Sequence, residues 1–346
     1  MNDNKLKVGI AGYGIVGKLR HKHIDNRTDM LVVSVCDRNL RGISSINRGT
    51  IRCYDNYKSM LDDSSLDVLF VCMTNDIVSE VTIAGLQAGF HVFCEKPPGR
   101  YVSDIENVIK IEKEHPDLKL MYGFNHRYHD SVQEVIRILE SNELGGLINL
   151  RGVYGKSKLV TFNQDDWRTK RSVSGGGVLL DQGIHMVDLM RLFAGEFIDI
   201  HSCISSNYWN FDVEDNAYAL MRTNKGVVGM LHSSATQWRH KFSLEINLEG
   251  GSINLGGILT GSKSYGAEIL TKVWSNHNGD SGDPKEQTMR YNTDPSWERE
   301  IGAFASSIKS NKSIEHGGSL DALLTMKLVY KIYMSDCDWS KKHNIN

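Results

Sequence analysis

The stretch Lys7-Val8-Gly9-Ile10-Ala11-Gly12-Tyr13-Gly14-Ile15-Val16-Gly17 decides the fold. Its first five residues form a short, mostly apolar run typical of a buried strand. Its last six have the form GxGxxG and open a helix-like segment over Ile15 to Asp25. A second apolar run, Leu31 to Cys36, ends at Asp37, about 20 residues beyond the last glycine. This order of strand, glycine turn, helix, strand and acidic residue predicts a dinucleotide-binding βαβ unit.

Each position of the glycine motif suits a dinucleotide for a physical reason. Gly12 permits the tight turn, Gly14 lets the backbone approach a pyrophosphate, and Gly17 lets the helix pack close to the strand. The free N–H groups at the helix start, around Ile15 and Val16, together with the helix dipole, attract the phosphates. We therefore expect these five residues to form part of a cofactor site.

The residues after the second predicted strand bear on which cofactor is bound. The carboxylate of Asp37 can accept hydrogen bonds from the adenosine ribose hydroxyls, and its charge repels a 2′-phosphate. Arg38 stands next to it, and an arginine there can accommodate that phosphate. The sequence favours NAD and leaves NADP possible.

The hydrophobic pattern predicts two domains. In the first part, near-continuous apolar runs alternate with helix-like segments, which indicates a parallel sheet covered on both faces. After about Asn125 the apolar residues alternate, as in an antiparallel sheet with one solvated face. The predicted class is α/β, with a Rossmann doubly wound parallel sheet over residues 1–124. A C-terminal α+β domain with a large, mostly antiparallel sheet follows over residues 125–346, for substrate and oligomerisation, and its last helices can pack back on the first domain.

Composition argues against several classes of partner. The chain has 346 residues and a formal net charge of -2, so it lacks the basic surplus that nucleic-acid binding needs. No apolar run approaches the roughly 20 residues of a membrane-spanning helix. The six cysteines form no CxxC pair and the thirteen histidines no HExxH motif, so no metal site is expected. A polar start and strand-buried cysteines indicate a cytoplasmic protein.

Several motifs in a fixed order resemble one family. They are, in chain order, GxGxxG at 12–17, Gly85 to Gly89, His91-Val92-Phe93-Cys94-Glu95-Lys96-Pro97, Gly123-Phe124-Asn125-His126-Arg127, Asp166-Trp167-Arg168 and Gly175 to His185. Together they resemble the Gfo/Idh/MocA oxidoreductases, the family of glucose–fructose oxidoreductase and inositol dehydrogenase. The resemblance is strong over roughly residues 6–195 and rests on pattern alone beyond them.

The resemblance implies hydride transfer between a nicotinamide and a carbon that bears a hydroxyl, on a sugar, a polyol such as inositol, or a sugar nucleotide. It implies catalytic roles for Lys96, Asp181 and His185, and assembly as a homodimer or homotetramer. Histidine suits removal of the hydroxyl proton because its pKa is near neutrality. Asp181 precedes His185 by four residues and can orient the substrate or the imidazole. The Lys96 ammonium can stabilise a developing alkoxide.

Further residues are expected in the cleft by resemblance. Four residues are placed near the cofactor, although Val78 stands where the family often has a histidine: Thr74, Asn75, Glu95 and Lys96. Four residues are placed near the substrate: Asn125, Arg127, Trp167 and Arg168.

Other interpretations remain open. The stripe Asp181, His185 and Asp188 also fits the solvated face of an ordinary amphipathic helix. A member of this family can instead retain NAD and oxidise a sugar transiently, as a redox-assisted glycosidase or lyase. A non-catalytic nicotinamide sensor is a third possibility, which the presence of Lys96, Asp181 and His185 disfavours.

Overall fold

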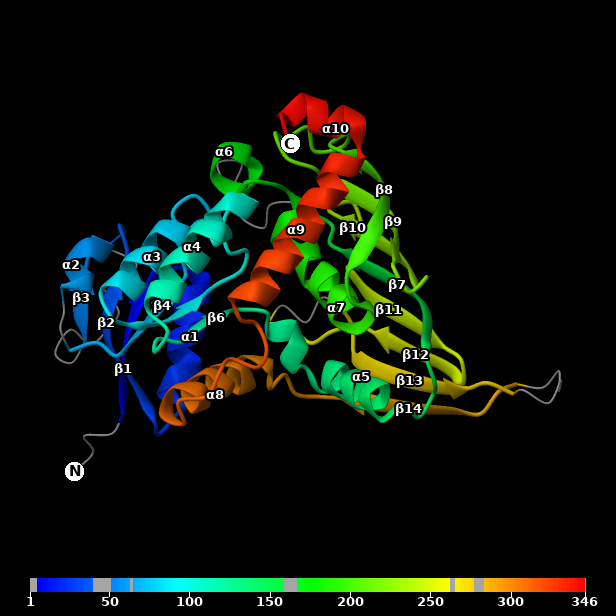
Figure 1. Ribbon diagram of the computed structural model, residues 1–346, viewed down its shortest axis with the longest axis horizontal. Helices are drawn as coiled ribbons and strands as arrows, with labels where there is room; N and C mark the ends of the chain where they lie inside the picture. Colours follow the sequence, from blue (N-terminus) through cyan, green and yellow to red (C-terminus); the bar gives the residue numbers. More distant parts are fainter. Residues whose placement is uncertain are drawn as a thin grey trace. The chain divides into compact units, whose positions relative to one another are not determined.

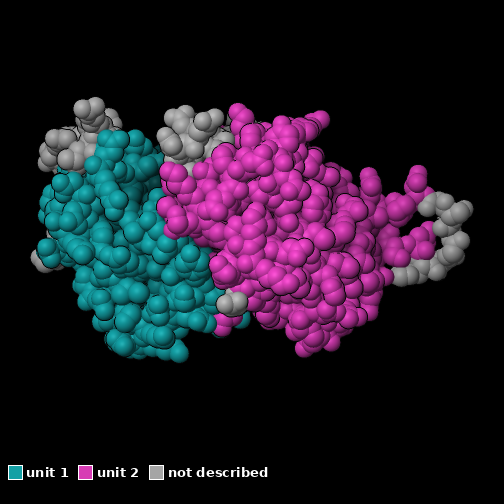
Figure 2. Space-filling model, turned by 90° about the horizontal axis from the view of Figure 1, so that it is seen from above, with its two compact units in different colours: residues 1–125, 297–324 teal, residues 126–296, 325–346 magenta. Residues whose placement is uncertain are grey.

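The computed structural model describes residues 5–39, 51–62, 65–158, 167–261, 265–276 and 283–345. The chain forms two compact units, coloured separately in Figure 2. The first contains Met1–Asn125 and Trp297–Leu324, and the second His126–Ser296 and Thr325–Asn346. Asp166, part of one motif quoted above, lies outside the described residues.

The first unit is built on a parallel sheet with the strand order β3-β2-β1-β4-β5-β6. This order is that of a dinucleotide-binding Rossmann domain and confirms the predicted doubly wound sheet. The strands are β1 (Leu6–Ala11), β2 (Met30–Cys36), β3 (Arg52–Tyr54), β4 (Val68–Val71), β5 (His91–Cys94) and β6 (Leu120–Tyr122).

Helices cover both faces of this sheet, with α3 and α4 together on one side and α1 and α8 on the other (Figure 1). Near-continuous apolar strands require this arrangement, because each face must be buried. The helices are α1 (Ile15–Asp25), α2 (Tyr57–Leu61), α3 (Val78–Gln87), α4 (Val102–Glu114) and α8 (Ser296–Lys309).

A buried arginine joins α8 to the rest of the first unit. Arg20 of α1 is 0% exposed, and its guanidinium lies 2.6 Å from the Glu95 carboxylate and 2.7 Å from that of Glu300 on α8. It also lies between the rings of Phe93 and Trp297, at 4.4 and 4.3 Å from their centroids. A charge this deep needs both carboxylates, since removing one partner leaves an uncompensated ion. This explains why a segment so late in the sequence belongs to the first unit.

The second unit contains a sheet in the order β14-β13-β12-β11-β7-β10-β9-β8. Its neighbouring strands are antiparallel except β7 and β10, which run parallel at its centre. The prediction of a large, mostly antiparallel sheet is confirmed. The strands are β7 (Leu147–Gly155), β8 (Phe197–Ser205), β9 (Asn216–Thr223), β10 (Val228–Ser234), β11 (Lys241–Leu248), β12 (Gly251–Gly256), β13 (Glu268–Trp274) and β14 (Glu286–Tyr291).

Helices pack on one face of this sheet, and the other face carries none of those drawn (Figure 1). Helix α7 packs closely because Gly152 and Gly229 leave room for Met186 and Met190, whose side chains would meet an added Cβ at 2.7 and 3.0 Å. The helical elements are η2 (Asn125–Tyr128), α5 (Asp130–Ser141), η3 (Trp167–Thr169), α6 (Arg171–Ser174), η4 (Leu179–Gly183), α7 (Ile184–Ala194), α9 (Ser319–Ser335) and α10 (Cys337–His343).

A buried carboxylate fastens the start of α5 to β13. Glu268 accepts hydrogen bonds from His129 Nδ1 at 2.9 Å, from Ser131 Oγ at 2.6 Å and from the Leu259 N–H at 3.1 Å. Burial raises the pKa of Glu268, but the hydrogen bonds and charge of His129 and the bonds from Ser131 and Leu259 outweigh it and lower the pKa below its usual value. The ionised carboxylate therefore stabilises the fold.

We expect the substitution Glu268→Gln to destabilise the protein in a pH-dependent manner. A depressed folded pKa gives stability that is present above the unfolded pKa of about 4.3 and is lost as the pH falls through the folded value. The melting temperature of the variant should lie roughly 3–10 °C below wild type at pH 7, from a loss of about 1–3 kcal/mol. Scanning calorimetry from pH 7.5 to 4.0 should show this gap narrowing.

Glu134→Gln on α5 is the matched control, because its partner Arg137 is half exposed and such pairs contribute little. A difference in melting temperature between Glu268→Gln and wild type that stays constant from pH 7.5 to 4.0 would contradict the conclusion that the ionised Glu268 carboxylate stabilises the fold.

Candidate functional site

The glycines of the turn between β1 and α1 differ in their surroundings: two are packed against backbone and one faces open space. Gly12 has φ +91°, and a Cβ there would lie 2.2 Å from the Cys72 carbonyl oxygen. A Cβ on Gly17 would lie 2.0 Å from the Gly12 carbonyl oxygen. At Gly14, by contrast, an added Cβ meets no atom within 4 Å. The chain therefore excludes side chains at Gly12 and Gly17 for its own packing, and leaves Gly14 beside open space.

The start of α1 fits an anionic group. The first turn contains no acidic residue, and the N-cap residue Gly14 provides no side-chain cap. Ile15 is 64% exposed. Helix N-termini present N–H donors and a partial positive charge, so this open cradle suits the pyrophosphate of a dinucleotide.

Asp37 is fixed against the same turn. Its Oδ2 accepts the Tyr13 N–H at 2.9 Å, and its Oδ1 accepts the Asn39 N–H at 2.8 Å. Arg38 beside it is exposed. The carboxylate thus lies at the carboxyl end of β2 with an orientation set by two backbone donors.

The remaining cofactor-side candidates follow β4 and β5, and their carboxyl ends share the edge of the sheet with the glycine turn, because all these strands are parallel. Asn75 is 6% exposed, and the Thr74 carbonyl accepts N–H groups at the start of α3. Glu95 points its carboxylate at Arg20, so the structure gives it an anchoring contact. Lys96 is half-buried, and its peptide bond to Pro97 is cis.

In the second unit, Asp181 lies between two cations. Its Oδ2 is 3.1 Å from Lys156 Nζ, and its Oδ1 is 3.6 Å from Arg168 Nε. Lys156 directly follows β7, while Arg168 lies on η3 with its guanidinium 4.5 Å from the ring centroid of Trp167. The structure brings together the predicted residues Asp181, Trp167 and Arg168. Lys156 was not predicted from the sequence.

His185 follows Asp181 at the start of α7. The helical segment that carries both residues begins with η4, a π-helical turn that contains Asp181, and continues as α7. His185 is 6% exposed and its ring stacks on that of His126, with centroids 3.8 Å apart and planes at 12°. His126 Nε2 lies 3.1 Å from the Tyr154 hydroxyl. The stack fixes the plane of the His185 imidazole.

Polar and aromatic side chains that the sequence did not single out extend this cluster. Gln182 Nε2 donates to the Tyr265 hydroxyl at 3.0 Å, and the Tyr265 and Tyr154 rings are 5.2 Å apart. His240 lies 5.1 Å from Tyr265 by ring centroids, and its pKa is lowered by burial and by the nearby Lys156 charge. Burial and the Asp181 charge outweigh the Gln182 hydrogen bond and raise the pKa of Tyr265 to about 12, so its hydroxyl stays protonated near neutral pH.

Two other sequence candidates are buried. Arg127 is 1% exposed, and its Nε and Nη2 each lie 2.7 Å from the Asp188 carboxylate, to which Thr325 Oγ1 also donates. This pair ties η2 to α7. Asp188 at 1% and His185 at 6% exposure also mean that the polar stripe of α7 is not a solvated face. Asn125, 7% exposed, begins η2.

Comparison with known proteins places this geometry in a family. The family described as "Oxidoreductase family, NAD-binding Rossmann fold" matches residues 6–124, and the "GFO/IDH/MocA C-terminal domain" matches residues 132–254. The chain belongs to the Gfo/Idh/MocA oxidoreductase family. The resemblance seen in the motifs is confirmed, and so is the expectation of an NAD-binding Rossmann domain.

Curated members of the Gfo/Idh/MocA family show which relatives share sequence with the chain. D-glucoside 3-dehydrogenase of Escherichia coli is 26% identical over 81% of this chain and 82% of its own length. Levoglucosan dehydrogenase of Pseudarthrobacter phenanthrenivorans is 25% identical over 58% of this chain and 54% of its own. Myo-inositol 2-dehydrogenase of Thermotoga maritima is 24% identical over 66% of this chain and 68% of its own.

Solved structures share the fold over nearly the whole chain. Levoglucosan dehydrogenase in complex with NADH superimposes with a TM-score of 0.84 at 19% identity, covering 97% of this chain and 98% of that one. The same enzyme with NADH and levoglucosan gives a TM-score of 0.85 over 96% and 97% of the two chains, again at 19% identity.

Within the described residues, no group of three His, Cys, Asp or Glu side chains is placed to hold a metal ion. Among the helices in this part of the chain, none combines the length and apolar character needed to cross a bilayer.

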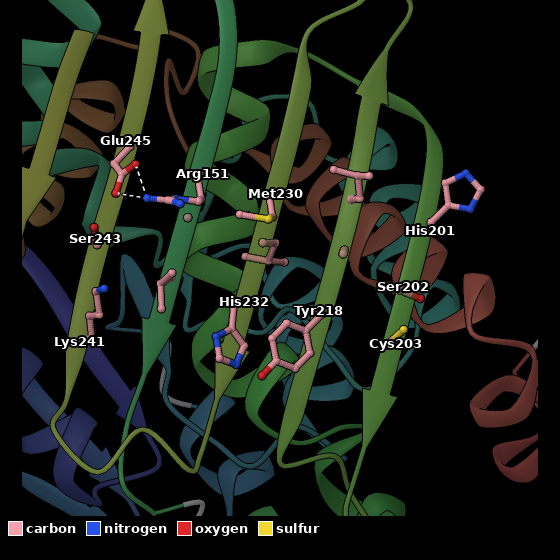
Figure 3. Close-up of a pocket in the computed structure, with 15 residues that line it drawn as sticks. Arg151, His201, Ser202, Cys203, Tyr218, Met230, His232, Lys241, Ser243 and Glu245 are labelled. Atoms are coloured by element: carbon pink, nitrogen blue, oxygen red, sulfur yellow. Dashed lines mark hydrogen bonds and ion pairs between the residues drawn. The ribbon is translucent and has the colours of Figure 1, made fainter.

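A hollow lies on the face of the second sheet opposite α7. Figure 3 shows its lining side chains in front of the strands, with the helices behind. Its volume is about 570 Å³. Cross-strand neighbours form its rows, including Tyr218 beside His232 and Leu220 beside Met230. The hollow is therefore separate from the Asp181 and His185 cluster, which lies on the α7 side of the sheet.

We expect Gly14→Ala to separate cofactor binding from folding. Gly14 has φ -76° and open space around it, so alanine fits the fold and the melting temperature should change by no more than about 2 °C. A methyl group beside the helix N-terminus should nevertheless weaken NADH binding by about tenfold or more. Titration of NADH fluorescence and a thermal melt measure the two effects.

Gly12→Ala is the comparison variant and should lower the melting temperature, because its backbone and the Cys72 carbonyl exclude a Cβ. Unchanged NADH affinity in a well-folded Gly14→Ala protein would contradict the assignment of the turn at Gly14 as the pyrophosphate-binding site.

Proposed function

We propose that this protein is an NAD-dependent dehydrogenase that oxidises a CH–OH carbon of a sugar, a polyol such as inositol, or a sugar nucleotide. The observation that carries the proposal is the held carboxylate of Asp181, clamped by Lys156 and Arg168 one turn before a buried histidine. An ionised, oriented carboxylate is suited to accept hydrogen bonds from vicinal hydroxyls, and an imidazole to accept a proton. The names of the related dehydrogenases support sugars and inositols as substrates.

The proposed roles balance the reaction. NAD held at the Gly12 to Gly17 turn would supply the acceptor for the hydride that leaves the carbinol carbon. The hydroxyl proton passes to the His185 imidazole, and the carbon–oxygen bond becomes a carbonyl. Asp181 holds a neighbouring hydroxyl, and the Lys96 ammonium stabilises negative charge on the reacting oxygen. Trp167, Arg168 and Asn125 contribute substrate contacts.

The orientation of Asp37 supports NAD over NADP. Two backbone N–H groups hold its carboxylate at the end of β2, where a 2′-phosphate would meet an ionised oxygen. The neighbouring Arg38 is exposed and leaves NADP as the weaker cofactor rather than an excluded one.

We expect Lys96→Ala and His185→Ala each to lower kcat by about 100-fold or more, the usual contribution of a general acid–base group. Reduction of NAD at 340 nm, measured against inositols, free sugars, glucosides and UDP- or GDP-sugars, identifies the substrate and provides the assay. Lys113→Ala, an exposed change on α4, is the control and should leave kcat unchanged.

Full turnover in both catalytic variants would contradict the assigned roles. Failure of every substrate, with nicotinamide still bound to purified protein, would favour the redox-assisted glycosidase or the sensor.

We also propose that the protein assembles as a homodimer or homotetramer through the open face of the second sheet. Exposed apolar residues occupy adjacent strands there, including Tyr218, Leu220 and Met230, at 50%, 51% and 44% exposure. An ion pair lies on each side of these residues, and each pair contributes one positive and one negative charge. The pairs are Arg151–Glu245, which Figure 3 labels, and Arg222–Asp199. An apolar patch bordered by both charges is complementary to a rotated copy of itself.

Met230→Glu should therefore convert the wild-type oligomer to smaller species, because a buried unpaired carboxylate is costly at an interface. Light scattering coupled to size exclusion at micromolar protein measures this. Met334→Glu is the control, because Met334 is also exposed, at 37%, but lies outside this face. It should leave the assembly unchanged. A monomeric wild type would contradict the proposal.

A further inference from the structure

One buried glutamate binds three consecutive backbone N–H groups where the Asp181-bearing turn begins. Glu214, in the segment between β8 and β9, is 0% exposed. Its Oε2 accepts the Gly177 N–H at 2.8 Å, and its Oε1 accepts the Leu179 N–H at 3.0 Å. Its own carbonyl oxygen accepts the Val178 N–H between them at 3.1 Å. Glu214 thus satisfies the donors that a helix start leaves open, although it lies 35 residues away from Leu179 in sequence.

The carboxylate of Glu214 is itself fixed from α9. The Tyr333 hydroxyl donates to Glu214 Oε1 at 2.7 Å. The approach of these two residues excludes side chains from the glycine run: a Cβ on Gly176 would lie 2.3 Å from the Tyr333 hydroxyl oxygen, and one on Gly177 would lie 2.1 Å from the Glu214 carbonyl oxygen. Glycine is therefore required at both positions, because a side chain at either one would collide with Tyr333 or Glu214.

The capped turn leads directly to the proposed catalytic residues. The Asp181 N–H bonds to the Gly177 carbonyl at 2.8 Å, so the residue that Glu214 holds is also the hydrogen-bond partner of Asp181. Further on, a Cβ on Gly183 would lie 2.2 Å from Ser233 Oγ of β10, which places the end of the turn against the sheet. The backbone that carries Asp181 is thus held at both ends, and His185 continues from it.

We propose that Glu214 and Tyr333 are positioning residues that set the Asp181 carboxylate and the His185 imidazole for the reaction. The inference rests on the proposed dehydrogenase function. Loss of either contact lets the start of the turn move, which shifts Asp181 relative to Lys156 and His185 relative to His126. Neither residue belongs to the unit that contains the glycine cradle, so NADH binding is expected to be unaffected.

The test compares Tyr333→Phe and Glu214→Gln with Tyr330→Phe. Tyr333→Phe removes one hydroxyl donor, and Glu214→Gln leaves an amide nitrogen that cannot accept an N–H. Tyr330 lies one turn earlier on α9 and serves as the control. We expect kcat/KM for the alcohol to fall about 3- to 10-fold in Tyr333→Phe and about 10- to 100-fold in Glu214→Gln, the scale of supporting-residue effects. The Kd for NADH should stay within about twofold of wild type in all three variants. Such a change corresponds to less than about 0.5 kcal/mol of binding free energy.

A second readout separates this proposal from the proposed function. In protein labelled with ¹³C-histidine, the His185 ring signal, assigned as the one missing from His185→Asn, should shift in Tyr333→Phe. The signal of its stacking partner His126 should shift with it, while the other ring signals stay in place. This measurement needs no substrate, so it remains decisive if no alcohol is oxidised or if Glu214→Gln does not fold. An unchanged His185 signal in Tyr333→Phe, with only the melting temperature lowered, would overturn the positioning role.

Discussion

Close packing of backbone against helix starts is the constraint on which both halves of this protein depend. In the first unit Gly12 and Gly17 allow the turn before α1 to lie against the Cys72 and Gly12 carbonyls, and Gly14 remains open. In the second, Gly176 and Gly177 allow Tyr333 and Glu214 to approach the turn that leads to Asp181. At both places a glycine-lined helix start lies beside the residues proposed for function, because only bare backbone permits such an approach.

Local patterns were enough to predict the architecture. The glycine motif and the acidic residue after β2 depend on a few adjacent residues, and apolar periodicity depends on which face of an element is buried. For these reasons the sequence predicted the parallel sheet and the mostly antiparallel sheet. Strand β3 was missed, since three residues beginning with Arg52 show no period. The π-helical turn at Leu179–Gly183 was missed because its residues read as ordinary helix.

Contacts between distant residues could not be predicted. Lys156 reaches Asp181 across 25 positions, and Tyr265 reaches Gln182 across 83. No local signal marks such partners, although a lysine directly after a strand was a place to look. Arg127 illustrates the opposite case: its motif suggested a substrate contact, but pairing with Asp188 leaves it 1% exposed. A buried arginine is stable only with such a partner, so Arg127 and Arg20 each organise the helices around them.

In the proposed reaction, a carbinol hydrogen of a sugar-like substrate passes directly to the nicotinamide. The most direct test supplies inositol, glucose and a methyl glucoside, each fully deuterated on carbon, together with NAD, and measures the reduced cofactor by mass spectrometry. We expect a substrate in this set to transfer one deuterium, which raises the mass of the reduced nicotinamide by one unit. Reduced cofactor that carries no deuterium, formed from these substrates in ordinary water, would contradict it.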